Sequence, residues 1–189
     1  MKLGEPFLAE GFRDLGRPAS VNKALCRLAS LGEIERVTRG VYVRPIIHKV
    51  LGKVSPSYFQ VLELIVKSSG ETLQTHGVEA VRKFGLSTQM QVRPVFYTSG
   101  RSRRFKIGSL DVELRHVHMD WLQHSDSLAG LALVAMFYVG KVSLNKYMCS
   151  LIMSKIPRDE QRKLMGSSMP SWMRKQCELA VEDALKLTS

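Results

Sequence analysis

The 189-residue sequence lacks the short motifs that mark the common enzyme classes. It has no phosphate-binding loop, no dinucleotide-binding G-x-G-x-x-G, no nucleophile elbow G-x-S-x-G and no zinc-binding H-E-x-x-H. No nucleophile stands at a recognisable spacing from a general base. We therefore expect no enzymatic activity and no catalytic residue.

Cysteine is scarce. Cys26, Cys149 and Cys177 are odd in number and far apart, so they suggest neither a disulfide framework nor a zinc site, as in a protein of the reducing cytosol. His116 and His118 would share one face of a strand, and metal binding there is a minor alternative. No cysteine or acidic cluster at ligand spacing accompanies them, so we expect neither a metal nor a cofactor.

Long apolar runs are also absent. The longest covers residues 128–139, which is too short to cross a bilayer, and no secretory signal opens the chain. We expect a cytoplasmic protein with no membrane partner.

Acidic residues are few. Asp and Glu number 17 against 28 Lys and Arg, which gives a formal net charge of +11. Such an excess favours a polyanionic partner, either nucleic acid or an acidic protein surface.

The stretch from Pro18 to Arg44 carries the clearest pattern. Pro18 suits the first turn of a helix and Gly32 its end. Two β-prone runs follow at 33–37 and 41–44 and are joined by a turn at 38–40. One apolar stripe at helical spacing would face the core: Val21, Ala24, Leu25, Leu28 and Leu31. A helix that leads into an arginine-tipped hairpin is typical of a winged helix-turn-helix.

The opposite face of this helix is polar. Asn22 and Lys23 lie near its N-terminal end and are suited to reading base edges, while Ser20 and Arg27 are suited to phosphates. These side chains could equally form an ordinary solvated face. The hairpin favours DNA, because its arginines can lie along a phosphate backbone or enter a minor groove. We expect DNA binding by Arg17, Ser20, Asn22, Lys23, Arg27, Arg36 and Arg39.

A short helix should precede this unit. Leu8, Phe12 and Leu15 recur at helical spacing, and Gly16 should end the helix before a tight turn. A winged helix normally has one more helix in front, and only residues 1–6 precede this one. The leading helix is therefore very short, supplied from elsewhere or lost through a late start residue.

The remainder predicts an α+β protein: a winged helix-turn-helix, then a mixed domain with a small antiparallel sheet and a helical C-terminal part. We expect the winged helix at 1–46, a partly buried connector at 47–56 and a second domain at 57–189, with strands up to residue 118 and helices from 119. The expected helices are 57–67, 75–84, 125–139, 143–154, 158–165 and 169–187, and the expected strands are 92–98, 101–107 and 110–117.

A two-residue turn at Gly108-Ser109 would make the last two strands a hairpin. Lys106 would then face Asp111 and Arg104 would face Glu113, so about half of the basic run 101–106 would be neutralised. Arg101 and Arg103 remain as possible contacts to a phosphate or an acidic partner.

The sequence resembles the AbiEi-type antitoxins of abortive-infection toxin–antitoxin operons. The likeness in the N-terminal region rests on Gly4-Glu-Pro-Phe7, Leu15-Gly16, Val21, Ala24-Leu25, Arg27-Leu28, Gly32-Glu-Ile34, Arg36 and Arg39-Gly-Val-Tyr42. Further along, it rests on Leu51-Gly52, Ser55-Pro56, Gly85-Leu-Ser-Thr-Gln89, Tyr97-Thr-Ser-Gly100, Arg103-Arg-Phe-Lys-Ile-Gly108 and Pro170-Ser-Trp172.

The resemblance implies that the winged helix binds an operator with inverted repeats in its own promoter and represses the operon. It also implies that the C-terminal domain counters a nucleotidyltransferase-like toxin, in many such systems without stable direct contact. An alternative is a protein-interaction module whose degenerate winged helix binds an acidic partner rather than DNA.

Overall fold

The computed structural model describes residues 2–50 and 52–186 and shows an α+β protein. The chain folds into two compact units. Unit 1 comprises Met1–Glu71 together with Arg104–Val112, and unit 2 comprises Thr72–Arg103 and the chain from Glu113 onward.

This division differs from the expected boundaries at residues 46 and 57. The segment 104–112 joins unit 1, where the Gly108 N–H donates a hydrogen bond to the Val37 carbonyl oxygen at 3.3 Å. Unit 1 is therefore built from two segments that are separated in the sequence by a segment of unit 2.

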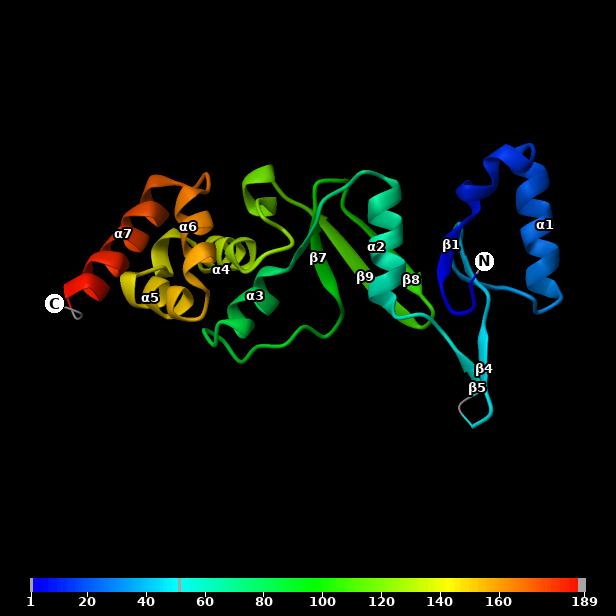
Figure 1. The fold of residues 1–189 in the computed structure, drawn as a ribbon, viewed down its shortest axis with the longest axis horizontal. Helices are drawn as coiled ribbons and strands as arrows, with labels where there is room; N and C mark the ends of the chain where they lie inside the picture. Colours follow the sequence, from blue (N-terminus) through cyan, green and yellow to red (C-terminus); the bar gives the residue numbers. More distant parts are fainter. Residues whose placement is uncertain (1, 51, 187–189) are drawn as a thin grey trace. The chain divides into compact units, whose positions relative to one another are not determined.

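Unit 1 begins with a small three-stranded sheet and two helical segments (Figure 1). The sheet has the order β1-β3-β2 and is antiparallel. Its apolar cluster consists of the buried Leu25, Ile34 and Tyr42, with Phe7 and other partly buried side chains around them. The elements in chain order are β1 (Pro6–Leu8), the 3₁₀-helix η1 (Ala9–Leu15), α1 (Pro18–Ser30), β2 (Glu35–Thr38) and β3 (Val41–Val43).

The α-helix expected around Leu8, Phe12 and Leu15 is not what the structure contains. Leu8 lies in β1, and the helix that follows is a 3₁₀-helix whose side chains repeat every three residues rather than every 3.6. Apolar residues spaced for an α-helix therefore do not line up on it, and Leu15 is 80% exposed. Gly16 ends the helix as expected.

The expected connector at 47–56 is mostly a hairpin. β4 (Ile46–His48) pairs antiparallel with β5 (Gly52–Val54), and every residue of both strands is exposed rather than partly buried. Residue 51 of the expected connector and residue 187 of the expected terminal helix lie outside the described residues. α2 (Tyr58–Ser68) follows, with Ser57 as its cap.

The central sheet has four strands in the order β6-β7-β9-β8. It is not wholly antiparallel, since β7 (Val95–Thr98) runs parallel to β9 (Leu110–His116). β6 (Leu73–Thr75) was not expected as a strand, and it pairs antiparallel with β7. β8 (Arg103–Ile107) meets β9 at the two-residue turn Gly108-Ser109, which confirms the expected position of that turn.

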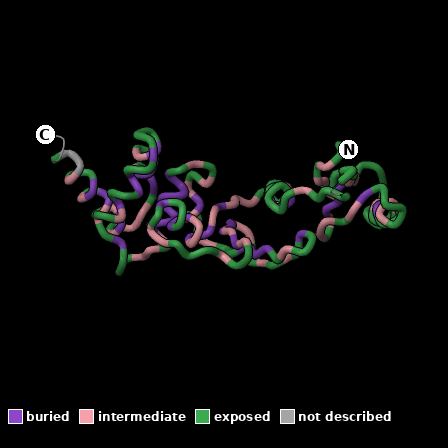
Figure 2. Tube along the Cα trace, turned by 90° about the horizontal axis from the view of Figure 1, so that it is seen from below, coloured by how far each residue is buried: buried purple, intermediate pink, exposed green. Residues whose placement is uncertain are grey.

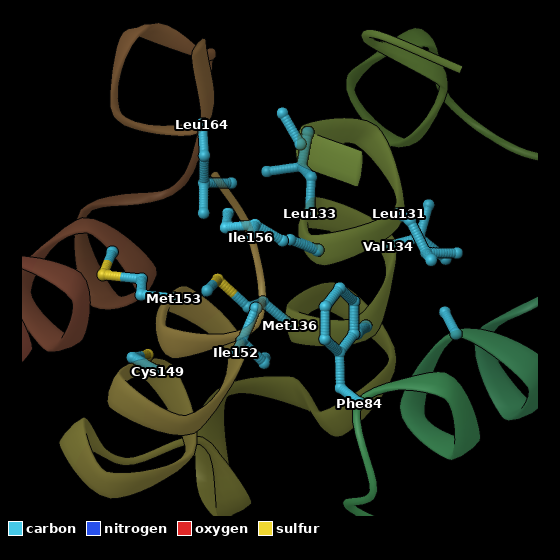
Figure 3. Close-up of a cluster of buried hydrophobic side chains, with 14 of the residues drawn as sticks. Phe84, Leu131, Leu133, Val134, Met136, Cys149, Ile152, Met153, Ile156 and Leu164 are labelled. Atoms are coloured by element: carbon cyan, nitrogen blue, oxygen red, sulfur yellow. The ribbon is translucent and has the colours of Figure 1, made fainter. Parts of the chain in front are cut away.

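Unit 2 contains the largest hydrophobic core. Figure 2 shows that the buried stretches gather toward the C-terminal part of the chain. Figure 3 shows side chains of α4, α5 and α6 together with Phe84 in this core. The helical elements are α3 (Gly77–Lys83), the 3₁₀-helix η2 (Met119–Leu122), α4 (Leu128–Ser143), α5 (Lys146–Ser154), α6 (Arg158–Gly166) and α7 (Ser171–Lys186). No helix in the described ranges combines the length and apolar character needed to cross a membrane.

Candidate nucleic-acid interface

α1 presents the predicted reading residues to solvent. Arg17 is its N-cap residue and Pro18 occupies the first helical position, where a missing N–H is tolerated. Ser20, Asn22 and Lys23 follow in the first two turns, and all three are exposed. The opposite face packs through the buried Leu25 and through Val21 and Leu28. The side chains expected to contact bases therefore lie together near the N-terminal end of one helix.

The expected apolar stripe is wrong at its last position. Leu31 lies after the helix, where it is the C-cap residue, and its side chain is 76% exposed. The helical spacing no longer applies there, so the apolar face ends with Leu28 and Ala29.

The charge on α1 has one sign. The helix contains Lys23 and Arg27 and no acidic residue. Arg17 stands immediately before it and is exposed. Among residues 2–50 and 52–186 the structure records no ion pair for these three cations, so no carboxylate in those ranges neutralises them. This is the property that a phosphate-binding surface needs.

The β2–β3 hairpin supplies the second part of the surface. Its turn is Arg39-Gly40, and Gly40 adopts a φ of +78°, a conformation that glycine allows at low cost. Arg39 and Arg36 are exposed, while the central strand β3 is buried along its whole length. The register shifts between Arg36 and Thr38, which marks a β-bulge next to the turn. Bulges increase local twist and re-aim side chains.

The turn of the hairpin is hydrogen-bonded to η1, and a groove lies between the turn and the helical segments. The Ala9 N–H donates to the Gly40 carbonyl oxygen at 2.9 Å, which ties the turn to the start of η1. A shallow groove of about 350 Å³ lies between η1, the start of α1 and the turn, and Asn22 lines it. The structure therefore brings Asn22 beside the hairpin tip, although 18 positions separate it from Gly40 in the sequence.

The groove also contains a pair of residues that the sequence patterns did not indicate. Glu10 and Arg13 both line it and form an ion pair at 2.8 Å, with both side chains largely exposed. Exposed pairs of this kind contribute little to stability, so Arg13 remains accessible to an anion. In the sequence, the opposite charges of Glu10 and Arg13 at a spacing of three residues could have indicated this ion pair.

Arg101 and Arg103 belong to unit 2, whereas α1 and the β2–β3 hairpin belong to unit 1. They flank the turn between β7 and β8, where an Arg103 Nη1–H donates to the Arg101 carbonyl oxygen at 3.1 Å. The turn is fixed further by the Ser102 hydroxyl, which accepts from the His116 N–H at 2.9 Å.

The charge pairing expected in the β8–β9 hairpin is more complex in the structure. Glu113 is buried and forms ion pairs with Arg93 and Arg115 at 2.9 and 2.6 Å. Lys106 and Asp111 are exposed, and within the described ranges the structure records no ion pair between them. Buried Glu113 therefore neutralises arginines of unit 2 that the hairpin register alone did not indicate.

Comparison with known proteins gives one family. The model of a family of unknown function, DUF6088, matches residues 1–164, which is most of the chain. Neither the curated proteins nor the solved structures give a match. Because the match extends from the α1 surface through most of the unit 2 helices, the chain belongs to the DUF6088 family.

Proposed function

We propose that this protein is a DNA-binding transcriptional repressor of its own toxin–antitoxin operon, with a winged helix-turn-helix in unit 1. The observation that carries the proposal is the acid-free, basic face of α1 beside an arginine-tipped hairpin. A helical segment, a turn and a second helix precede that hairpin, in the order typical of the motif. The strand order β1-β3-β2 supports the same arrangement, because the N-terminal strand joins the hairpin.

A gel-shift assay with the promoter of the protein's own operon tests the proposal. Arg39→Ala removes a phosphate-binding cation, so it should weaken binding to specific and unrelated DNA alike. Asn22→Ala removes a base-reading amide, so it should alter the preference among operator variants by about 1–3 kcal/mol at the contacted base pair. Arg162→Ala on α6 and Ser30→Ala at the far end of α1 are matched controls, and neither should change binding.

Cys26 offers a direct reporter of the surface. It lies exposed on α1 between Lys23 and Arg27, whereas Cys149 and Cys177 are buried. A maleimide should label Cys26 in the free protein, and bound operator DNA should slow that labelling. Equal labelling rates with and without DNA, measured at saturating operator, contradict the assignment of α1.

We further propose that the protein acts as an antitoxin against a nucleotidyltransferase-like toxin. The support is the resemblance of its sequence to AbiEi-type antitoxins. The test is co-expression with a nucleotidyltransferase-like toxin, with bacterial growth as the readout. The protein should restore growth, and Asn22→Ala should rescue as well as the parent if the antitoxin activity is separate from DNA reading.

One observation favours a second candidate, a protein-interaction module that binds an acidic partner. The segment before α1 is a 3₁₀-helix with no buried residue, which is a weak first element for a DNA-reading motif. A pull-down from cells with and without nuclease treatment separates the two functions. Partners that persist after nuclease treatment, together with no operator shift, favour the interaction module.

A further inference from the structure

Two of the three cysteines meet in the core of unit 2. Cys149 lies on α5 and Cys177 on α7, and their Sγ atoms are 3.9 Å apart. The Met136 Sδ atom on α4 lies 3.6 Å from the Cys177 Sγ atom. Figure 3 shows Cys149 among the buried side chains of this core. Because 28 positions separate the two cysteines in the sequence, sequence patterns did not predict that they meet.

The two thiols are not equivalent. The Cys177 thiol donates its proton toward the Cys149 sulfur. This contact lowers the pKa of Cys149 and, together with burial, raises the pKa of Cys177. The Cys149 sulfur is therefore the better nucleophile of the pair, because the thiolate is the reactive form.

The geometry suits a covalent link. A disulfide needs an S–S distance of about 2.05 Å and side chains that point toward each other. Cys149 and Cys177 already point toward each other from two helices that pack together. Their Sγ atoms have to move from a separation of 3.9 Å to the length of an S–S bond. Side-chain rotation or a small shift of α7 can supply that movement.

We propose that Cys149 and Cys177 are a reversible thiol modification site, where a small disulfide oxidant creates a bond that links α5 to α7. Glutathione disulfide represents this class of oxidant. The inference does not depend on DNA binding, because both residues lie in unit 2.

The chemistry balances in two exchange steps. The Cys149 thiolate attacks one sulfur of the small disulfide, whose S–S bond breaks and releases one small thiol after protonation. The Cys177 thiol then loses its proton and attacks the Cys149 sulfur of the mixed disulfide, which releases the second small thiol. The protein loses two protons and two electrons, and the oxidant takes up both pairs to become two thiols.

The rate of the exchange reaction depends on how readily the oxidant reaches the two cysteines. Both cysteines are fully buried, so the reaction requires a transient local opening that separates α7 from α5. Cys26 is exposed and should react first, forming a mixed disulfide that has no neighbouring thiol to resolve it. The three cysteines therefore provide an internal comparison between an open site and a paired buried site.

The test treats the full chain with glutathione disulfide under native conditions and maps the peptides without reduction. Trypsin places Cys149 in residues 147–155 and Cys177 in residues 176–186, so a link joins two identifiable peptides. We expect these peptides to be joined, the melting temperature to rise by several degrees and dithiothreitol to reverse both effects. Cys26→Ser should leave the link intact, and Cys149→Ala and Cys177→Ala should each abolish it and the temperature shift.

Three results overturn the proposal. One is glutathione attached stably to both buried cysteines, which means that the second thiol does not resolve the first. Another is a link that includes Cys26. The third is a link that forms only in denaturant, which means that the folded protein does not react. The peptide map distinguishes these results in the unaltered protein, so they do not depend on the folding of any variant.

Discussion

At the scale of single residues, Glu160 connects two helices. Its side chain on α6 is buried, and its Oε2 atom accepts a hydrogen bond from the Ala129 N–H at 2.7 Å in the first turn of α4. Lys163 pairs with the same carboxylate. The contact with Lys163, followed by the bond from Ala129, lowers the pKa of Glu160 from 4.5 to about 2. A negative charge at the N-terminus of α4 is also favourable to the helix dipole.

The first prediction follows from this depressed pKa. The ionised form of Glu160 stabilises the fold above pH 4.5, and the contribution is lost as the pH falls toward 2. Glu160→Gln should therefore lower the melting temperature at pH 7 and make the melting temperature less dependent on pH between 4.5 and 2. Thermal unfolding across this range, with exposed Glu178→Gln as the control, measures the effect. An unchanged pH profile in Glu160→Gln contradicts it.

The second prediction concerns Gly130 at the start of α4. A Cβ atom placed there would lie 2.0 Å from the His124 carbonyl oxygen, so backbone would have to move. Gly130→Ala should destabilise the protein by about 1–3 kcal/mol, as overpacking does. Gly166→Ala on α6 is the matched control, since nothing lies within 4 Å of its added Cβ, and it should be neutral or slightly stabilising. Urea unfolding of both variants gives the comparison.

At the scale of elements, α2 shows how a short sequence pattern sets a helix start. The Ser57 hydroxyl accepts from the Gln60 N–H at 3.2 Å, and the Gln60 side chain accepts from the Ser57 N–H at 3.1 Å. This reciprocal pair is a capping box, which satisfies two backbone donors that the helix itself leaves free.

The third prediction is that this pair acts as a unit. Ser57→Ala should cost about 1 kcal/mol of unfolding free energy, in the range measured for N-cap residues. Gln60→Ala should cost less, and the double variant should cost less than the sum of the two single changes because the two hydrogen bonds cooperate. Chemical unfolding of the four proteins completes the cycle, and strict additivity would show that the two bonds are independent.

Several elements were predictable because their signals are local. Gly108-Ser109 identified a hairpin turn, and Pro157 and Pro170 marked the starts of α6 and α7. Two features were not predictable, since they depend on distant partners. β6 is too short to show alternation, and β7 and β9 pair in parallel although β8 lies between them in the sequence. The apolar spacing of η1 gave no sign of its 3₁₀ geometry.

The features of the candidate site likewise fall into those that local sequence patterns predict and those that depend on packing. The exposed cations on α1 and the hairpin followed from helical periodicity and turn residues, so their exposure was predictable. The groove that brings Asn22 beside Gly40 depends on how η1, α1 and the hairpin pack, and periodicity carries no information on that packing. The neutralisation of Arg93 and Arg115 by buried Glu113 was hidden for the same reason.

At the scale of the whole molecule, charge should dominate DNA binding. Each phosphate contact by Lys or Arg releases counterions and adds about −0.9 to the slope of log K against log salt concentration. The fourth prediction is that operator binding weakens steeply with salt, and that Arg39→Ala reduces the slope by about 0.9. Arg162→Ala should leave the slope unchanged. Binding titrations at several salt concentrations measure the slope. An affinity that does not change with salt concentration would exclude a phosphate-contacting surface.

The fifth prediction concerns fragments of the chain. A fragment of residues 1–71 lacks the segment 104–112, which contributes Ile107, Gly108 and Leu110 to a pocket beside Arg36. It also lacks the hydrogen bond from Gly108 to Val37. We expect residues 1–71 to be less protected from amide exchange along β2 than the same residues in the full chain. Equal protection in the two proteins would mean that the returning segment adds nothing to unit 1.

The return of residues 104–112 to unit 1 has a consequence for gene exchange. A recombination event or a fusion that cuts the gene once cannot separate the two units, because any single cut leaves part of one unit on the wrong side. The α1 surface and the unit 2 helices are therefore inherited as one module. Exchanging unit 1 between relatives requires one junction near residue 71 and a further pair of junctions around the β8–β9 turn.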